Sequence, residues 1–158
     1  MTKDTIQTFT YRISKANKTE MIAILYDMGI QYLSDGLVAL SQDRRDDFRL
    51  EINRARGVVK ELMSSVNTGA DQGLNFLSIY VFCNRELTKA FVDFDKEAVT
   101  TIKSIFEELS ETYKKVSSYD KSSPVMGNTE KIYSGLTYNR SLLSNLVSDV
   151  SSNRGYLV

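Results

Sequence analysis

Apolar residues recur every three or four positions in one long segment of this chain after another, and this spacing is typical of amphipathic α-helices. Residues 17–40 are the clearest case. Asn17 and Glu20 stand three residues apart at the start of this segment, as in a capping box, so we predict a helix that begins near Lys18. The main apolar stripe of this helix is Ile22, Leu25, Gly29, Tyr32, Gly36 and Leu40.

The same segment is also apolar on a second side. Ile24, Ile30 and Val38 lie off the main stripe, and Tyr26 and Leu33 flank it. An apolar arc this wide exceeds what one neighbouring helix covers. Two interpretations stay open: a central helix with several helical neighbours, or a helix that turns one face to the core and the other to a binding partner.

Three later segments repeat the helical spacing, with only short polar breaks between them. Asp71 and Asp95 are suited to cap the second and third of these segments. Short connections favour antiparallel neighbours, so we predict an all-α fold, an antiparallel up-down four-helix bundle over residues 17–117. The three stripes are Phe48, Ile52, Ala55, Val59, Leu62 and Val66; Leu74, Leu77, Tyr80, Val81, Asn84, Leu87, Thr88 and Phe91; and Ala98, Ile102, Ile105, Phe106, Leu109, Tyr113 and Val116.

The two ends of the chain differ from the predicted bundle. Residues 1–16 alternate aromatic and polar positions over too short a stretch to define a strand, and we expect a flexible N-terminal tail. The alternative is that its aromatic rings lie in a groove on the bundle. Residues 118–127 shift to serine, glycine and proline and indicate a linker. Residues 128–158 then resume a helical period and predict an additional C-terminal amphipathic helix.

Composition excludes several classes of function. The chain has 158 residues, enough for one domain with a core, and its twenty basic residues balance twenty acidic ones. This balance argues against binding to nucleic acid or to an anionic membrane surface. No apolar run is long enough to span a membrane, so we expect a cytoplasmic protein without membrane insertion.

Catalytic and metal-binding patterns are also missing from the sequence. It contains no histidine, and Cys83 is its one cysteine. The Glu-x-x-His pattern of di-metal bundles, phosphate-binding glycine loops and paired-cysteine metal sites are all absent. We therefore expect no enzyme activity, no metal and no cofactor. A catalytic bundle lined by carboxylates remains the weakest alternative.

Three motifs resemble, in order and at compatible separations, the signatures of the FliS-type flagellar secretion chaperones over about residues 17–116. The first is the Leu-Tyr-Asp triplet of residues 25–27. The second is RARGVVKELMSSVN, residues 54–67, in which an Arg-Ala pair leads into apolar pairs and Glu-Leu. The third is IYVFCNRELTKA, residues 79–90, which ends in Arg-x-Leu-Thr-x-Ala. One departure is Met28, where the family usually has glycine.

The resemblance implies a cytoplasmic chaperone whose surface groove holds the C-terminal segment of newly made flagellin and prevents premature polymerisation. The candidate contacts for this partner are on the first long helix: Ile24, Leu25, Tyr26 and Ile30. A monomer is favoured. The alternative is a homodimeric structural or regulatory adaptor without an unfolded client, in which the surplus apolar surface is buried between two copies.

The C-terminal extension lies beyond the family's typical length, so its role is argued from its residues alone. Its predicted helix would dock on the bundle through one apolar stripe, and two sites remain open for it. It either occupies the client groove as an internal substitute for flagellin, or it packs permanently elsewhere on the bundle. The stripe consists of Ile132, Leu136, Leu143, Leu146 and Val150.

Overall fold

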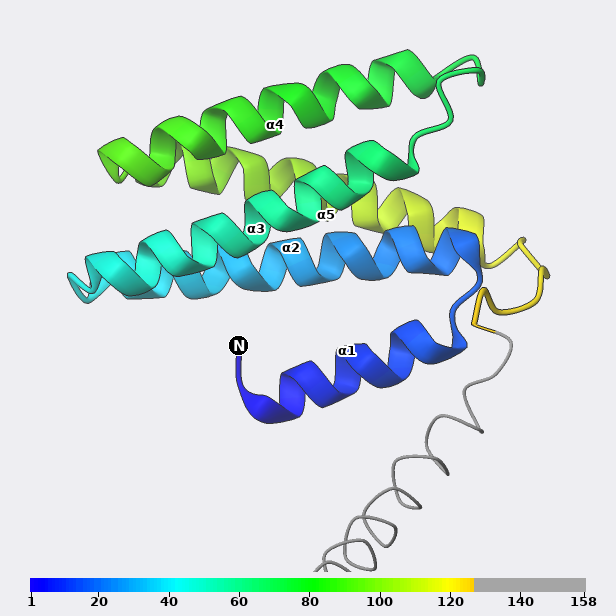
Figure 1. The fold of residues 1–158 in the computed structure, drawn as a ribbon, viewed down its shortest axis with the longest axis horizontal. Coiled ribbons are helices and arrows are strands. Elements are labelled where there is room, and N and C mark those ends of the chain that lie inside the picture. The colour runs from blue at the N-terminus through cyan, green and yellow to red at the C-terminus, as the bar shows by residue number, and fades with distance from the viewer. Residues whose placement is uncertain (127–158) are drawn as a thin grey trace, which may run out of the picture. The chain divides into compact units, whose positions relative to one another are not determined.

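A computed structural model describes residues 1–126 of the chain, and every regular element in this part is an α-helix. This confirms the predicted all-α class for the described residues. The bounds are α1 Lys3–Lys15, α2 Lys18–Ser41, α3 Arg45–Ser65, α4 Gly73–Asp93 and α5 Lys96–Ser117 (Figure 1).

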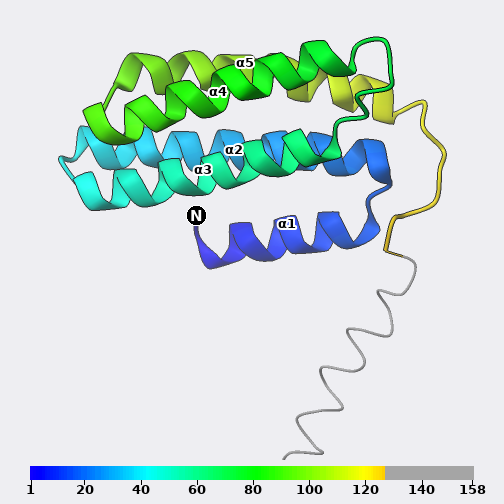
Figure 2. The same ribbon diagram turned by 45° about the horizontal axis from the view of Figure 1, so that its top comes forward.

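Helices α2 to α5 lie side by side, and each runs in the direction opposite to the helix before it (Figures 1 and 2). Helix α2 packs against α3 and α5, and α4 packs against the same two helices. Most residues of the predicted apolar stripes meet in one main core, because each helix turns its stripe toward the others. Leu74, Val81 and Val116 were predicted in the stripes but are exposed. The fully buried large side chains of this core are Tyr26, Leu33, Phe48, Ile52, Val59, Leu62, Tyr80, Leu87, Val99, Ile102 and Phe106.

The helix starts follow the predicted caps in two cases and differ in one. The Asn17 side chain accepts a hydrogen bond from the Glu20 backbone N–H at 2.8 Å, and the Glu20 carboxylate accepts from the Asn17 N–H at 2.9 Å. This is the expected capping box. Asp95 caps α5 as predicted. Asp71 does not cap α4: Gln72 precedes that helix and makes no side-chain capping bond, because the chain forms a turn before Gly73.

The N-terminal segment is a helix rather than the flexible tail that we expected for residues 1–16. Helix α1 begins after Thr2, whose hydroxyl accepts a hydrogen bond from the Thr5 N–H at 3.3 Å. Ile6, Phe9 and Ile13 are spaced by three and four residues, so the alternation visible in the sequence concealed a helical period. A helix of 13 residues is marginal alone in water, and α1 gains its stability by packing against α2.

The segment after α5 is not helical as far as residue 126. It is hydrogen-bonded to the junction between α1 and α2. The Asp120 carbonyl accepts from the Asn17 side-chain amide at 3.0 Å, and its carboxylate accepts from the Thr19 hydroxyl at 2.5 Å. The Val125 N–H donates to the Ala16 carbonyl at 3.0 Å. We call residues 118–126 the C-terminal clip; the predicted helix over 128–158 lies outside the described residues.

Candidate client-binding face on α2

The second apolar side of α2 is covered by α1. Ile24 is 4 % exposed, and it forms a small core with Phe9 and Ala16 that is separate from the main core. Half-buried side chains complete this small core: Met1, Ile13, Met21 and Met28. Of the two interpretations left open by the sequence, the contacts within the chain fit a central helix with several helical neighbours, since the main stripe of α2 faces α3 and α5 and its second face holds α1.

Helix α1 is held by few buried side chains. It buries two residues, Phe9 and Ser14, whereas α2 and α3 bury seven each. Its outer side leaves Ile6 and Tyr11 more than half exposed, at 53 % and 55 %. Burying the Phe9 ring and the Ile24 side chain contributes about 3–6 kcal/mol before the cost of ordering the chain. The face under α1 is thus an apolar surface on which a helix packs through few buried side chains.

A polar cluster around Asp27 fastens α1 and α5 to α2. Its carboxylate accepts hydrogen bonds from Arg12 of α1 at 2.8 Å and from Lys114 and Ser110 of α5 at 2.7 and 2.8 Å. Burial alone would raise the pKa of this carboxyl group, but the bonds from Lys114, Arg12 and Ser110 outweigh burial and lower the pKa below its usual value. Asp27 is therefore ionised at neutral pH and links three helices.

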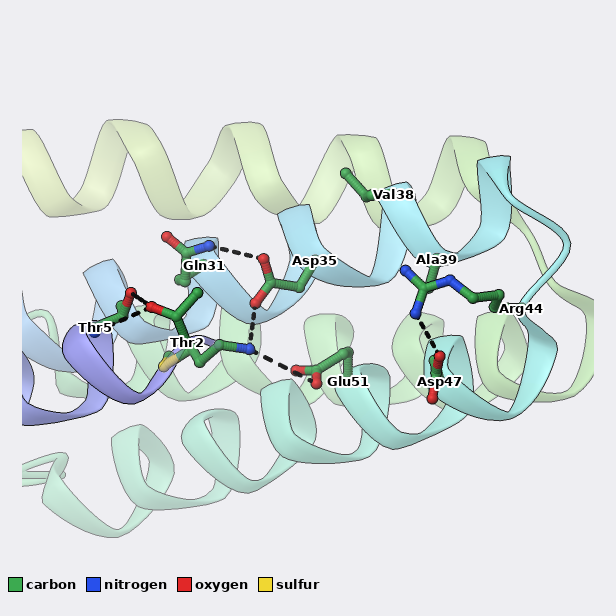
Figure 3. A pocket seen from close by; sticks show the side chains of 10 residues that line it. Thr2, Thr5, Gln31, Asp35, Val38, Ala39, Arg44, Asp47 and Glu51 are labelled. Carbon is green, nitrogen blue, oxygen red and sulfur yellow. Dashed lines mark hydrogen bonds and ion pairs between the residues drawn. The ribbon is translucent and has the colours of Figure 1, made fainter.

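A pocket of about 340 Å³ lies at the N-terminal end of α1, between α2 and α3. The α-ammonium nitrogen of Met1 lies 2.7 Å from the Asp35 carboxylate and 4.0 Å from that of Glu51 (Figure 3). Gln31 donates to the other Asp35 oxygen at 2.8 Å. The start of α1 is thus held by charge, and its middle by apolar contacts.

The four predicted partner residues do not share one surface. Ile24 faces α1, whereas Leu25 and Ile30 are half-buried against the main core. Tyr26 has no exposed surface: its hydroxyl is hydrogen-bonded to that of Tyr80. Burial raises the pKa of Tyr26 far above its usual value, so the phenol stays neutral. Ile24 is the one of the four that belongs to the helix-binding face.

Sequence reasoning missed Met21 and Met28 as members of this face, although residues 21, 24 and 28 follow helical spacing. It also missed Phe9 and Arg12, because no helix was predicted there. Met28 packs in the small core against α1 at the position where the family usually has glycine. A flexible thioether fills irregular gaps, which suits packing between two helices of unequal length.

Comparison with models of known protein families identifies the family of this chain. Residues 1–120 match the family model described as Flagellar protein FliS. The chain belongs to the FliS family. The match takes in α1 and the start of the C-terminal clip, so both are part of the FliS region of the chain. A search among curated proteins found no match.

FliS proteins are flagellar export chaperones, and the motifs of residues 25–27, 54–67 and 79–90 lie inside the matched region. Within residues 1–126, no group of acidic and cysteine side chains is arranged to hold a metal ion. None of the five described helices combines the length and the apolar character required to cross a bilayer.

Proposed function

We propose that this FliS-family chain binds the C-terminal region of flagellin in the cytoplasm and prevents its premature polymerisation. In this proposal α2 to α5 form the antiparallel up-down bundle that serves as the scaffold, and the client binds as a helix on the α2 face that α1 covers. The observation that carries the proposal is that this face already holds a helix, bound through a small apolar core centred on Ile24.

The chemistry of the face suits helix-in-groove recognition. Met21, Ile24 and Met28 form an apolar row, and Asp27 lies beside it with an ionised carboxylate. An amphipathic client helix would insert apolar side chains where Phe9 now lies. Since α1 belongs to the same chain, it competes at high effective concentration, and a client must bind more tightly than α1 does to replace it. Such competition would prevent weak, nonspecific binding of other helices.

Tyr26 and Leu25 act in this proposal by positioning α2 rather than by touching the client. The Tyr26 ring packs edge-on against Phe106, with ring centres 5.5 Å apart. Together with the Tyr80 hydrogen bond, this contact fixes the rotation of α2 about its axis. That rotation determines which residues of α2 point toward the client.

The test is calorimetric titration with a C-terminal flagellin peptide from the same species. We expect one peptide to bind per chain and Ile24→Asp to weaken binding at least tenfold, because a charge at the centre of the apolar row is costly to bury. Val92→Asp is the matched control, since Val92 is 62 % exposed on α4, away from α1. This control should leave binding unchanged.

Two results would contradict the proposal. Unchanged binding of the peptide by Ile24→Asp would mean that the peptide does not use the α2 face. In sedimentation, a tight dimer that ignores the peptide would instead support the homodimeric adaptor. Thermal unfolding of each variant checks that Ile24→Asp keeps its fold, which is expected because Ile24 lies outside the main core.

A further inference from the structure

A second pocket opens at the end of the bundle where α2 and α4 begin and α3 and α5 end (Figure 1). We call it the end pocket; its volume is about 270 Å³. Its apolar lining consists of Ile22, Val66, Phe76, Tyr80 and Tyr113. Tyr80 is buried, whereas the other four side chains are half-buried against the main core. The end pocket therefore leaves a part of the main core accessible from solvent.

One wall of the end pocket is the folded connection between α3 and α4. The Asn67 carbonyl accepts a hydrogen bond from the Ala70 N–H at 3.1 Å, and the Ala70 carbonyl accepts from the Gly73 N–H at 2.9 Å. A Cβ atom on Gly73 would collide with the Asn67 carbonyl group, so the connection lies directly against the first turn of α4. These bonds hold the wall in place without a ligand, as is usual for binding pockets.

Three aromatic rings determine what the end pocket can hold. The centre of the Phe76 ring lies 6.3 Å from that of Tyr80 and 5.9 Å from that of Tyr113. Such rings pack well against another aromatic or large apolar side chain. Drug-sized ligands occupy pockets of about 300–1,000 Å³. The end pocket is smaller than this range, so it suits one large side chain rather than a whole cofactor.

The charge around the end pocket is positive. Lys18 is the one charged residue that lines it, and within residues 1–126 this lysine forms no ion pair. Helix α4 begins here without a capping side chain or an acidic residue in its first turn, so the positive end of its dipole adds to the charge of Lys18. The Asp120 carboxylate accepts from the Thr19 hydroxyl, but Asp120 does not line the pocket. A ligand with one apolar group and one negative charge fits this arrangement.

We propose that the end pocket binds the carboxyl-terminal residue of a peptide chain, with its side chain between the aromatic rings and its α-carboxylate at Lys18. The last residue of a chain combines a side chain with a free main-chain carboxylate, and capture of this carboxylate is a recurring mode of peptide recognition. The inference rests on the proposed function for the identity of the partner, which is the flagellin client. The client would then be held at two places, the α2 face under α1 and the end pocket.

Both places use the first turns of α2. Lys18 and Ile22 line the end pocket, and Met21 and Ile24 belong to the apolar row. A helix is about 10–12 Å across, so a few extended residues connect its two sides. An internal helix of another protein could fill the apolar row, but it would bring no chain end to Lys18. The end pocket would therefore favour a segment that ends at the correct distance from its helix.

The first experiment uses a single residue as the probe and needs no flagellin. N-acetyl-phenylalanine carries one aromatic side chain and one free carboxylate, and its amide is the matched neutral probe. In NMR titrations of the full chain at millimolar probe, we expect the acid to shift the backbone signals of Ile22, Gly73 and Phe76. The acid should bind roughly fivefold more tightly than the amide, the upper range for one exposed ion pair.

Lys18→Gln should remove this preference for the acid. Lys96→Gln is the matched control, because Lys96 is also the exposed first residue of a helix, α5, at the opposite end of the bundle (Figure 1). Both lysines are on the surface, so both variants are expected to fold, and the control should keep the preference. Equal binding of the two probes by the native chain, or no shift at Ile22, Gly73 and Phe76, would overturn the proposal. The same holds if Lys18→Gln keeps the preference.

The second experiment tests the chain end of the client. A flagellin peptide that ends at the natural C-terminus is prepared as the free acid and as the C-terminal amide, and both are titrated in calorimetry. The acid should bind the native chain roughly fivefold more tightly than the amide, again as for one exposed ion pair, and Lys18→Gln should bind both forms equally. Equal affinities for the native chain would overturn the assignment of the client's end to this pocket. A peptide that binds in neither form would count against the proposed function, while the single-residue probes would still decide whether the end pocket is a binding site.

Discussion

At the residue scale, Gly29 shows how closely α2 approaches α5. A Cβ atom placed on Gly29 would lie 2.5 Å from Cε2 and 2.7 Å from Cδ2 of Phe106. Phe106 is fully buried and packs against Tyr26, so its ring has little room to move. Glycine is therefore required at position 29 for close packing and not for an unusual backbone conformation.

Gly29→Ala should lower the free energy of unfolding by about 1–3 kcal/mol, since overpacking in a dense core costs that much. Gly57→Ala is the matched control, because Gly57 is also in the middle of a helix and a Cβ there meets nothing within 4 Å. The control should be neutral or stabilise the fold by about 0.5–1 kcal/mol. Chemical denaturation of both variants measures the difference, and equal effects would show that Phe106 shifts freely.

At the scale of elements, an ionised side chain of α2, Asp27, links α1 to the rest of the described helices. The Asp27 carboxylate accepts hydrogen bonds from Arg12 of α1 and from Lys114 of α5. The Ala16 and Asn17 junction that follows α1 is held by the C-terminal clip. If a client displaces α1 as proposed, these bonds would keep its base attached, so we expect a hinged movement rather than loss of the whole segment.

The pH dependence of α1 docking follows from Asp27. Its folded pKa is lowered, so its contribution is present above the unfolded pKa of about 4 and is lost as pH falls through the folded pKa. We measure docking by the hydrogen-exchange protection of the α1 backbone amides. The part of this protection that Asp27 contributes should be constant from pH 8 to about pH 5 and should weaken below about pH 4. Asp27→Asn should lower the hydrogen-exchange protection of the α1 amides at neutral pH. It should also remove the loss of protection that Asp27 causes below about pH 4.

Glu86→Gln is the control for Asp27→Asn. Glu86 also carries a lowered pKa, through Lys89 and Arg85, but this pair lies on the surface of α4. Surface pairs contribute little to stability, so the control should leave hydrogen exchange in α1 unchanged. An Asp27→Asn chain whose α1 protection matches that of the native chain at pH 7 would contradict the anchoring role of Asp27.

At the scale of the whole molecule, the C-terminal extension remains the untested part of the sequence-based prediction. Its stripe of Ile132, Leu136, Leu143, Leu146 and Val150 lies outside the described residues. If it substitutes for flagellin in the client groove, a chain that ends after Met126 should bind the flagellin peptide more tightly than the full chain in calorimetry, because a tethered competitor has been removed.

A second truncation, after Ser123, separates the extension from the clip. It also removes the Val125 N–H that donates to Ala16, whereas the chain ending after Met126 keeps this bond. If only the shorter chain binds more tightly, the clip and not the extension limits access. Unchanged affinity with an intact fold in both would place the extension away from the client site, and lost solubility would indicate a permanent structural helix.

The sequence by itself predicted four of the five described helices, α2 to α5, because apolar spacing and capping residues act within one turn or segment. Asn17, Glu20 and Asp95 placed the starts of α2 and α5 correctly, and the stripes identified most of the main core. The wide apolar arc of α2 also indicated a second occupied face. These features depend on neighbours three or four residues apart, which a sequence displays directly.

Only the tertiary structure decided what covers each face and where the charges meet. Helix α1 is too short to be identified from its own propensity and depends on α2 for stability. Tyr26 was expected at the client surface, but its hydroxyl bond to Tyr80 turns it into the core. Asp35 and Glu51 are 16 positions apart in the sequence, and they share an ammonium group because α3 folds back along α2. Contacts between distant segments depend on the rotation and register of packed helices, and local spacing does not encode them.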